Sequence, residues 1–298
     1  MRLVSLLCLA ALACTPKTPD DSEPGDDSGD SAPPDSPADS GDSAPGDSGD
    51  STTQDTADTA DTGDIVEPPW GEGPLTVRGQ VYFFDMETPG IIDWIHDVEG
   101  AEVYVFEAPE LRVEVSPGDD HAFVIEGIPE GVELTLAVVH PDYFPHLTAT
   151  LATADYDLDG VTFQAVSRSI ATLASALLGV DVNDTSRCQM STTVSAIGAG
   201  DVWAPGEPGA TVTTEPNVPI DQGPFYFDTT VIPNPSLIET TTDGGVVIVG
   251  AEPGTYLWDA HKDGVTFEQL KLRCVGGWLT NGSPPYGLNV IDEGRGGH

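Results

Sequence analysis

The amino-acid sequence predicts an all-β protein, with two tandem antiparallel β-sandwiches joined by a short helix and preceded by a disordered acidic tether. The first observation is a series of short stretches in which apolar and polar residues alternate, separated by turns rich in Gly and Pro. The second is an internal repeat, FVIEGIPEGVELTLAV at residues 123–138 and VVIVGAEPGTYLWDAH at residues 246–261. The third is a tract at residues 14–69 with almost no large apolar side chains.

The repeat indicates two structural copies of one unit. With a constant offset of 123 residues, the Gly-x-x-x-Gly motif around Pro129 aligns with the Gly-x-x-x-Gly motif around Pro253. Gly accepts a positive φ and Pro fixes φ, so we predict that each copy is a β-hairpin. A repeat at this spacing predicts two similar domains, at residues 70–165 and 187–293, followed by a short tail at residues 294–298.

Residues 1–13 resemble a secretory signal, because a basic residue precedes an apolar run too short to span a bilayer. The run ends in Ala13 and Cys14, which resembles a bacterial lipobox. We therefore expect lipidation of Cys14 in an exported protein anchored at the outer membrane or the cell surface. Cys8 is a poorer site because the bulky Leu7 precedes it. Ordinary signal cleavage without lipidation is the alternative.

Residues 14–69 form the predicted tether, which contains the near-repeats GDSGDS at residues 46–51 and DTADTADT at residues 55–62. Chain entropy is not offset where there are no apolar side chains to bury, and like charges extend the segment. A flexible chain of ~50 residues spans ~40 Å. A calcium-binding repeat is the alternative to a plain hydrophilic tether, but the irregular spacing argues against it.

The first sandwich is predicted to open with a strand, because apolar and polar residues alternate from residue 75 to residue 83. Further strands are expected at residues 101–105 and 111–115. Residues 86–98 are interpreted as a loop-like insertion that covers one end of the sandwich. HPDYFPH at residues 140–146 is typical of a turn held by two prolines.

Four motifs of the first sandwich indicate a family resemblance. They are VRGQV at residues 77–81, EGAEVYVF at 99–106, FVIEGIPEG at 123–131 and LTLAVVHPDYFP at 134–145. Together they resemble the carboxypeptidase regulatory-like domain, a seven-stranded transthyretin-like sandwich, although Asp142 stands where that family usually has Gly. The second sandwich matches less fully, through PGATV at 208–212 and VGAEPGTYLWDA at 249–260. The resemblance implies a modular, non-catalytic role, because members of the family are attached to many unrelated proteins.

The linker at residues 166–186 is predicted to begin with a helix that ends at Gly179. Ser167 or Ser169 can cap its start. Since so short a helix is marginal alone, we expect it to dock onto one or both sandwiches. The residues that share its apolar face are Val166, Ile170, Leu173, Leu177 and Leu178.

Besides the lipidated Cys14, the cysteines left after the predicted processing are Cys188 and Cys274, and both lie in the second sandwich. An exported protein meets oxidising conditions, so we predict a disulfide between them. A pair of buried free thiols is the alternative.

Metal and cofactor sites are weakly indicated. Asp155, Asp157 and Asp159 match the first half of a calcium loop, but its twelfth position is Val166 where a bidentate Glu is needed. His140, Asp142 and His146 lie on the predicted proline turn and are interpreted as ordinary turn residues. We therefore expect no metal and no cofactor, and calcium at the three aspartates is the alternative.

The charge and the motifs restrict the function. A formal charge of −40 with ten Lys and Arg excludes a nucleic-acid partner, which requires basic side chains to replace phosphate counterions. No metalloprotease, serine-hydrolase, phosphate-loop or dinucleotide motif occurs in the sequence. We therefore expect a lipid-anchored, non-catalytic binding or structural module at the cell envelope, with the membrane and an unidentified protein or carbohydrate as partners. An enzyme whose site is assembled between the domains would need titratable groups that converge in a pocket.

A carbohydrate-binding accessory protein is the alternative function, and Tyr256 and Trp258 are its candidate residues. The offset of 123 places them on Glu133 and Thr135, which are predicted to face away from the first core. Two aromatic side chains on such a face need a cover, which could be the helix, the other domain or a sugar ring.

Overall fold

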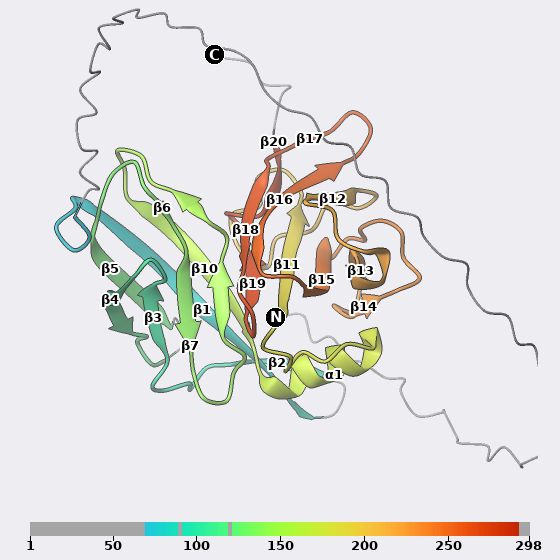
Figure 1. Ribbon diagram of the computed structural model, residues 1–298, viewed down its shortest axis with the longest axis horizontal. Helices are drawn as coiled ribbons and strands as arrows, with labels where there is room; N and C mark the ends of the chain where they lie inside the picture. The colour runs from blue at the N-terminus through green and yellow to red at the C-terminus, as the bar shows by residue number, and fades with distance from the viewer. Residues whose placement is uncertain (1–68, 89–90, 119–120, 292–298) are drawn as a thin grey trace, which may run out of the picture. The chain divides into compact units, whose positions relative to one another are not determined.

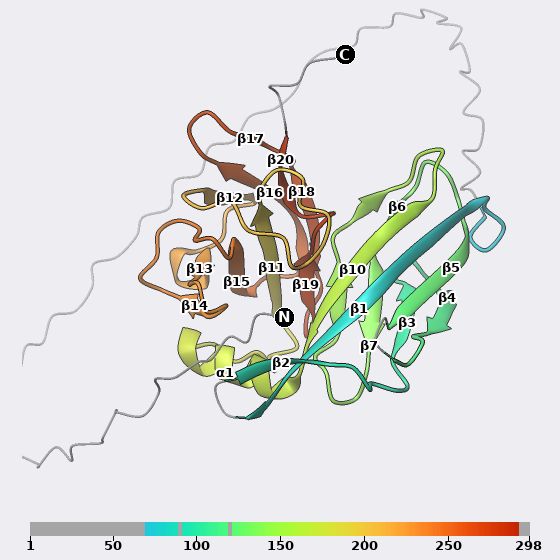
Figure 2. The ribbon, with the colours of Figure 1, turned by 180° about the vertical axis from the view of Figure 1, so that it is seen from behind.

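Strands dominate the computed structural model, which describes residues 69–88, 91–118 and 121–291 (Figures 1 and 2). The described residues contain one α-helix, α1 (Arg168–Leu178), and one short 3₁₀ helix, η1 (Ile220–Gln222). The all-β prediction is therefore confirmed. The predicted signal, the tether up to residue 68, and the tail lie outside the described residues.

The first half consists of two sheets that enclose apolar side chains. One sheet contains β1 (Leu75–Thr88), β2 (Ile91–Ile95), β5 (Ala122–Ile128) and β10 (Leu158–Val166). Facing strands are β3 (Glu102–Val105), β4 (Ala108–Glu114), β7 (Leu136–Val139) and β8 (His146–Thr148), with β6 (Glu133–Leu134) and β9 (Leu151–Ala152) as a small separate pair. Alternation along β1 buries Val81 and Phe83 in the core and places Tyr82 and Phe84 on the opposite face.

The second half is built in the same way. One group of strands comprises β11 (Cys188–Ser195), β13 (Phe225–Phe227), β14 (Pro233–Asn234), β15 (Gly245–Ala251), β17 (Thr266–Phe267), β19 (Leu279–Gly282) and β20 (Leu288–Ile291). The other is a three-stranded sheet of β12 (Thr211–Glu215), β16 (Gly254–His261) and β18 (Leu270–Cys274).

The two halves repeat one pattern of strand pairing. In the first, β1 pairs antiparallel with β5 and parallel with β10, and β7 pairs antiparallel with β3 and β8. In the second, β11 pairs antiparallel with β15 and parallel with β19, and β16 pairs antiparallel with β12 and β18. The sheets are therefore mixed, not antiparallel throughout as predicted. Each closing strand arrives from the opposite sheet, so no hairpin determines its direction.

The prediction that each copy of the repeat is a hairpin is wrong. In the first copy β5 and β7 belong to different sheets, and so do β15 and β16 in the second. Each copy is an arch that carries the chain from one sheet to the other. A hairpin and an arch both need a tight turn and both bury alternate residues of two strands, so the sequence pattern is the same for both.

A continuous sheet joins the halves. β19 pairs parallel with β8, with Leu279 opposite His146, so one sheet runs from β14 through β11, β19 and β8 to β4. Side chains and backbone add to this ladder: the backbone N–H of Thr150 donates to the carbonyl of Lys271 at 2.9 Å. Ion pairs between the halves join Lys271 to Glu133 and Arg273 to Glu107. The buried side chains of both halves form one continuous cluster.

The linker helix α1 begins and ends as predicted. Of the two candidate caps, Ser167 caps it, because its Oγ accepts from the N–H of Ile170 at 3.3 Å. Gly179 ends it with a φ of 70°. The predicted apolar face is only partly right, since Ala171 is the buried helix residue whereas Leu177 is 40% exposed. Ala171 packs in a small cluster with Phe144 and Leu279, so the helix contacts residues of both halves.

Candidate functional site

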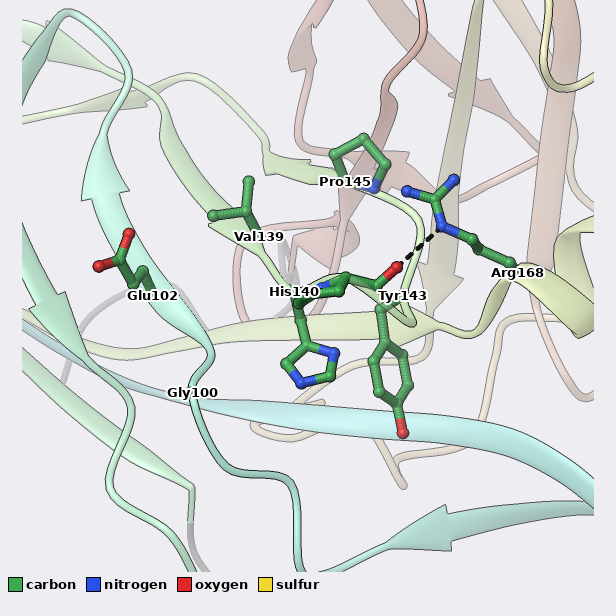
Figure 3. Close-up of a pocket in the computed structure, with 8 residues that line it drawn as sticks. Gly100, Glu102, Val139, His140, Tyr143, Pro145 and Arg168 are labelled. Carbon is green, nitrogen blue, oxygen red and sulfur yellow. Dashed lines mark hydrogen bonds between the residues drawn. The ribbon is translucent and has the colours of Figure 1, made fainter.

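An open pocket of about 380 Å³ lies where the proline turn of the first half meets the start of α1 (Figure 3). Arg168, the first helix residue, extends its guanidinium over the turn and donates from Nε to the carbonyl of Pro141 at 3.1 Å, the dashed line in Figure 3. The residues that line the pocket are Gly100, Glu102, Val139, His140, Pro141, Tyr143, Pro145 and Arg168.

Arg168 differs from the other basic side chains of the described residues. Each of those lies within ion-pair distance of a carboxylate, whereas Arg168 makes no such pair in the described part of the chain. The pairs are Arg78 with Asp157 and Asp159, Arg112 with Glu102, Arg187 with Glu252, Lys262 with Glu207, Lys271 with Glu133, and Arg273 with Glu107. The pocket thus has one positive charge, beside a Glu102 that already pairs with Arg112.

His140 is not placed for proton transfer in this pocket. Its Nδ1 accepts from the N–H of Asp142 at 3.2 Å, which puts the ring proton on Nε2, and Nε2 donates to the carbonyl of Glu99 at 3.1 Å. Both nitrogens therefore serve to shape the turn. The charged side chains that line the pocket are therefore one guanidinium, Arg168, and one carboxylate, Glu102, which is in an ion pair with Arg112.

His146 of the same turn is fully buried, away from His140. Its Nδ1–H donates to the carbonyl of Phe144 at 2.5 Å, and its Nε2 accepts from the N–H of Val166 at 3.2 Å. Burial lowers the pKa of His146 to about 4, so the ring is neutral at pH 7. In the described residues no three His, Cys, Asp or Glu side chains are grouped to hold a metal ion.

A second candidate site is an aromatic cluster formed by Tyr82 and Phe84 of β1, Trp94 and His96 in and after β2, and Trp203 of the loop between β11 and β12. The ring centroid of Trp203 lies 5.8 Å from that of Tyr82, 5.7 Å from that of Trp94 and 6.1 Å from that of Phe84. The rings of Trp94 and Tyr82 are 5.2 Å apart, and those of Trp94 and His96 are 4.1 Å apart. Trp203 is 57% exposed despite these contacts.

Local structure explains why these side chains meet. Tyr82 and Phe84 share one face of β1, and Phe84 is directly opposite Trp94 in the β1 and β2 ladder. Figure 2 shows β2 alongside the end of β1. The interpretation of residues 86–98 as a loop is wrong, because β2 lies within them, and without β2 the cluster cannot be predicted. The sequence feature that could have pointed to Trp203 is the presence of a large aromatic residue in a loop of small residues, between Gly198 and Gly206.

Tyr256 and Trp258 do not form a platform, and that prediction is wrong. They are 6% and 0% exposed and belong to the core of the second half. Their own sandwich covers both side chains, so that neither the helix, nor the other domain, nor a ligand is needed as a cover.

The error lies in the register that the ungapped repeat implies. Val103 is opposite Val138 in the first half, and the equivalent Val212 is opposite Ala260 in the second. Beyond the turn the true offset is thus one residue less than 123, which moves each side chain to the other face. The turns differ because Gly131 has a φ of 70°, whereas the matching Gly already belongs to β16.

The acidic loop of the calcium candidate forms hydrogen bonds with an arginine side chain of the protein, Arg78. Arg78 donates from Nη1 to Asp157 at 2.8 Å and to Asp159 at 3.2 Å. The hydrogen bonds from Arg78, and then from the N–H of Thr76, lower the pKa of Asp157. Two of the three predicted carboxylates, Asp155 being the third, therefore neutralise an arginine.

The disulfide between Cys188 and Cys274 is present, with a Cα–Cα distance of 5.6 Å. It joins the start of β11 to the end of β18 and so links the two sheets of the second half. The predicted lipidation site, Cys14, lies outside the described residues. In the part of the chain that the structure describes, no helix has the length and apolar character to cross a bilayer.

Comparison with known proteins gives no family. No protein-family model and no curated protein matches the chain. Among solved structures the chain is similar to the TIE protein of Bacillus anthracis, with 10% identity, a TM-score of 0.22, and coverage of 73% of this chain and 34% of that one. It is also similar to the minor pilin of Streptococcus agalactiae, with 8% identity, a TM-score of 0.23, and coverage of 75% and 99%. The streptococcal ancillary pilin gives 10% identity, a TM-score of 0.22, and coverage of 72% and 68%.

Proposed function

We propose that this protein is an exported, non-catalytic binding module of the cell envelope. The aromatic cluster carries the proposal, because it exposes a Trp ring that is supported from beneath by three other rings. An aromatic surface of this kind can hold a ligand through ring contacts. His140 in the pocket near α1 supports the same conclusion, since both of its nitrogens bond to the backbone.

The proposal includes the anchor. The Ala13 and Cys14 motif supports lipidation at Cys14, at the outer membrane or the cell surface, and residues 14–69 would then hold the folded part away from the membrane. The proposal also includes membership of the first half in the carboxypeptidase regulatory-like domains. The four sequence motifs of that half support this membership. A nucleic-acid partner is excluded from the proposal by the charge of −40.

The anchor is tested by replacing Cys14 with Ala in a bacterial host that lipidates exported proteins. We expect the variant to move from the membrane fraction to the soluble fraction and to lose incorporation of labelled fatty acid. Cys8→Ala is the matched control and should stay with the membrane, because Cys8 is expected to leave with the signal. A Cys14→Ala variant that still carries fatty acid would show that the anchor has been assigned to the wrong residue.

A further inference from the structure

We infer that the exposed ring of Trp203, with the polar groups at its rim, is a binding site for a neutral sugar chain. The inference rests on the proposed role as a binding module and names the ligand class. It replaces Tyr256 and Trp258, which are buried, with an aromatic side chain that faces solvent.

The loop that carries Trp203 is closed and internally bonded. At its neck the N–H of Ala196 donates to the carbonyl of Pro205 at 3.1 Å. At its tip Asp201 organises the turn, because its Oδ1 accepts from the N–H of Trp203 at 2.9 Å and its carbonyl accepts from the N–H of Ala204 at 3.2 Å. A ring held in this way loses little conformational freedom when a ligand binds.

Three rings of the first half support Trp203 from one side. Trp203 meets Tyr82 nearly edge-on, at an interplanar angle of 88°, and Phe84 at 70°. Trp94 meets it at 49°. The indole is therefore in contact with the protein on this side, while the residue as a whole is 57% exposed. A flat, exposed indole suits the C–H face of a pyranose ring, which is apolar and of similar width.

Hydrogen-bonding groups of the right kind surround the ring. The Tyr82 hydroxyl donates to Oε1 of Gln80 at 2.9 Å, which places an amide at one edge of the cluster. Asp201 lies next to the ring in the chain, because its Oδ1 accepts from the backbone N–H of Trp203 at 2.9 Å. Burial of Tyr82, and then the charge of Asp201, raise the pKa of Tyr82. Carboxylate and amide oxygens accept from sugar hydroxyls, and the amide nitrogen can donate to them.

The geometry argues against a quaternary ammonium ligand. A cation held between aromatic rings lies within ~6 Å of each centroid, so opposed rings must stand well apart to admit it. In the cluster the centroids of Trp203 and its three neighbours are 5.7 to 6.1 Å apart, and the rings already contact one another. The space that a cage would need is filled by the protein.

Charge argues against an anionic ligand. The cation–π contacts among the described residues are those of Arg112 with Tyr104 and Arg273 with Phe106, and neither involves the aromatic cluster. Asp201 and the formal charge of −40 would repel uronic acids and sulfated sugars. A neutral polysaccharide fits both the apolar ring and the acidic rim.

The test is binding of the purified full chain to an array of neutral and acidic glycans, followed by titration with the neutral oligosaccharide that binds best. We expect binding to neutral glycans only, quenching of tryptophan fluorescence on titration, and a rise in Kd of about tenfold or more in Trp203→Ala. Trp203→Phe should retain part of the affinity. Tyr156→Ala is the matched control, because Tyr156 is 62% exposed but lies outside the cluster, and its Kd should not change.

Three results would overturn the inference. They are no binding to any neutral glycan, a preference for acidic glycans, and a Trp203→Ala variant that binds as well as the parent chain. Thermal unfolding of Trp203→Ala is measured alongside, so that loss of binding through misfolding is recognised, with Trp203→Phe as the folded substitute. If no glycan binds while release from the membrane still depends on Cys14, the sugar site is wrong and the anchored module stands.

Discussion

At the scale of single residues, the fully buried His146 and the partly buried Asp243 affect stability in opposite directions. Burial lowers the pKa of His146 to about 4, so the folded state resists its protonation, and stability is lost as pH falls from about 6.5 to 4. Burial, and to a lesser extent the charge of Asp228, raises the pKa of Asp243 to about 6, although the N–H of Gly245 donates to it. The folded state binds this proton more tightly than the unfolded chain, so stability is lost as pH rises from about 4 to 6.

We predict that Asp243→Asn stabilises the protein at pH 8 and not at pH 4. The amide keeps the acceptor for Gly245 and removes the buried charge, so the free energy of unfolding should rise by about 2 to 3 kcal/mol at pH 8. Urea denaturation at both pH values measures it. Asp263→Asn, at an exposed position, is the control and should have a similar small effect at each pH. An equal gain from Asp243→Asn at pH 4 and pH 8 would contradict the raised pKa.

At the scale of elements, β16 shows where prediction from the sequence succeeds and where it fails. The repeat correctly predicts two strands and a turn, because the apolar periodicity and the glycines are visible in the sequence. The face that Trp258 occupies depends on the length of the turn. A turn that is one residue shorter moves every following side chain to the opposite face of the strand. Gly131 takes a positive φ and its counterpart an extended conformation, and an ungapped alignment contains no information on that difference.

The register of β16 is tested by two neighbouring substitutions. Trp258→Ala should lower the free energy of unfolding by about 3 to 5 kcal/mol, because it empties a fully buried site in the core. Leu257→Ala, which removes a half-buried side chain on the opposite face, should cost less than about 1.5 kcal/mol. Chemical denaturation of both variants gives the comparison. If Leu257→Ala is the more damaging of the two, the face assignment fails.

At the scale of the whole molecule, pairing between β8 and β19 makes one body from the two halves. This contact could not be predicted, because it joins residues near 146 to residues near 279 and local periodicity does not identify the partner of an edge strand. The aromatic cluster depends on the same long-range arrangement, since Trp203 and Trp94 belong to different halves. By contrast α1, with its end at Gly179 and a cap at Ser167 or Ser169, follows from local spacing and could be predicted. The disulfide could be predicted from the two cysteines of the second half.

We predict that the two halves unfold in a single transition, because the continuous sheet and the shared core couple them. Native-state hydrogen exchange at increasing denaturant provides the measurement. Amides of β5 in the first half and β15 in the second should lose protection at the same denaturant concentration, while amides of exposed loops exchange earlier and act as the internal reference. Loss of protection in β5 well before β15 would mean that the halves unfold independently.

The position of β1 also determines how the molecule withstands mechanical force. β1 is the first strand of the described chain, and it is hydrogen-bonded to β5 over residues 75–80 on one side and to β10 over residues 77–84 on the other. A force that pulled the end at Leu75 along the axis of β1 would act on both ladders at once. Because the ladder bonds of antiparallel β5 run across that direction and those of β10 are slanted to it, many bonds are sheared together instead of breaking one at a time. The strand that receives the pull is thus the one that both neighbours restrain.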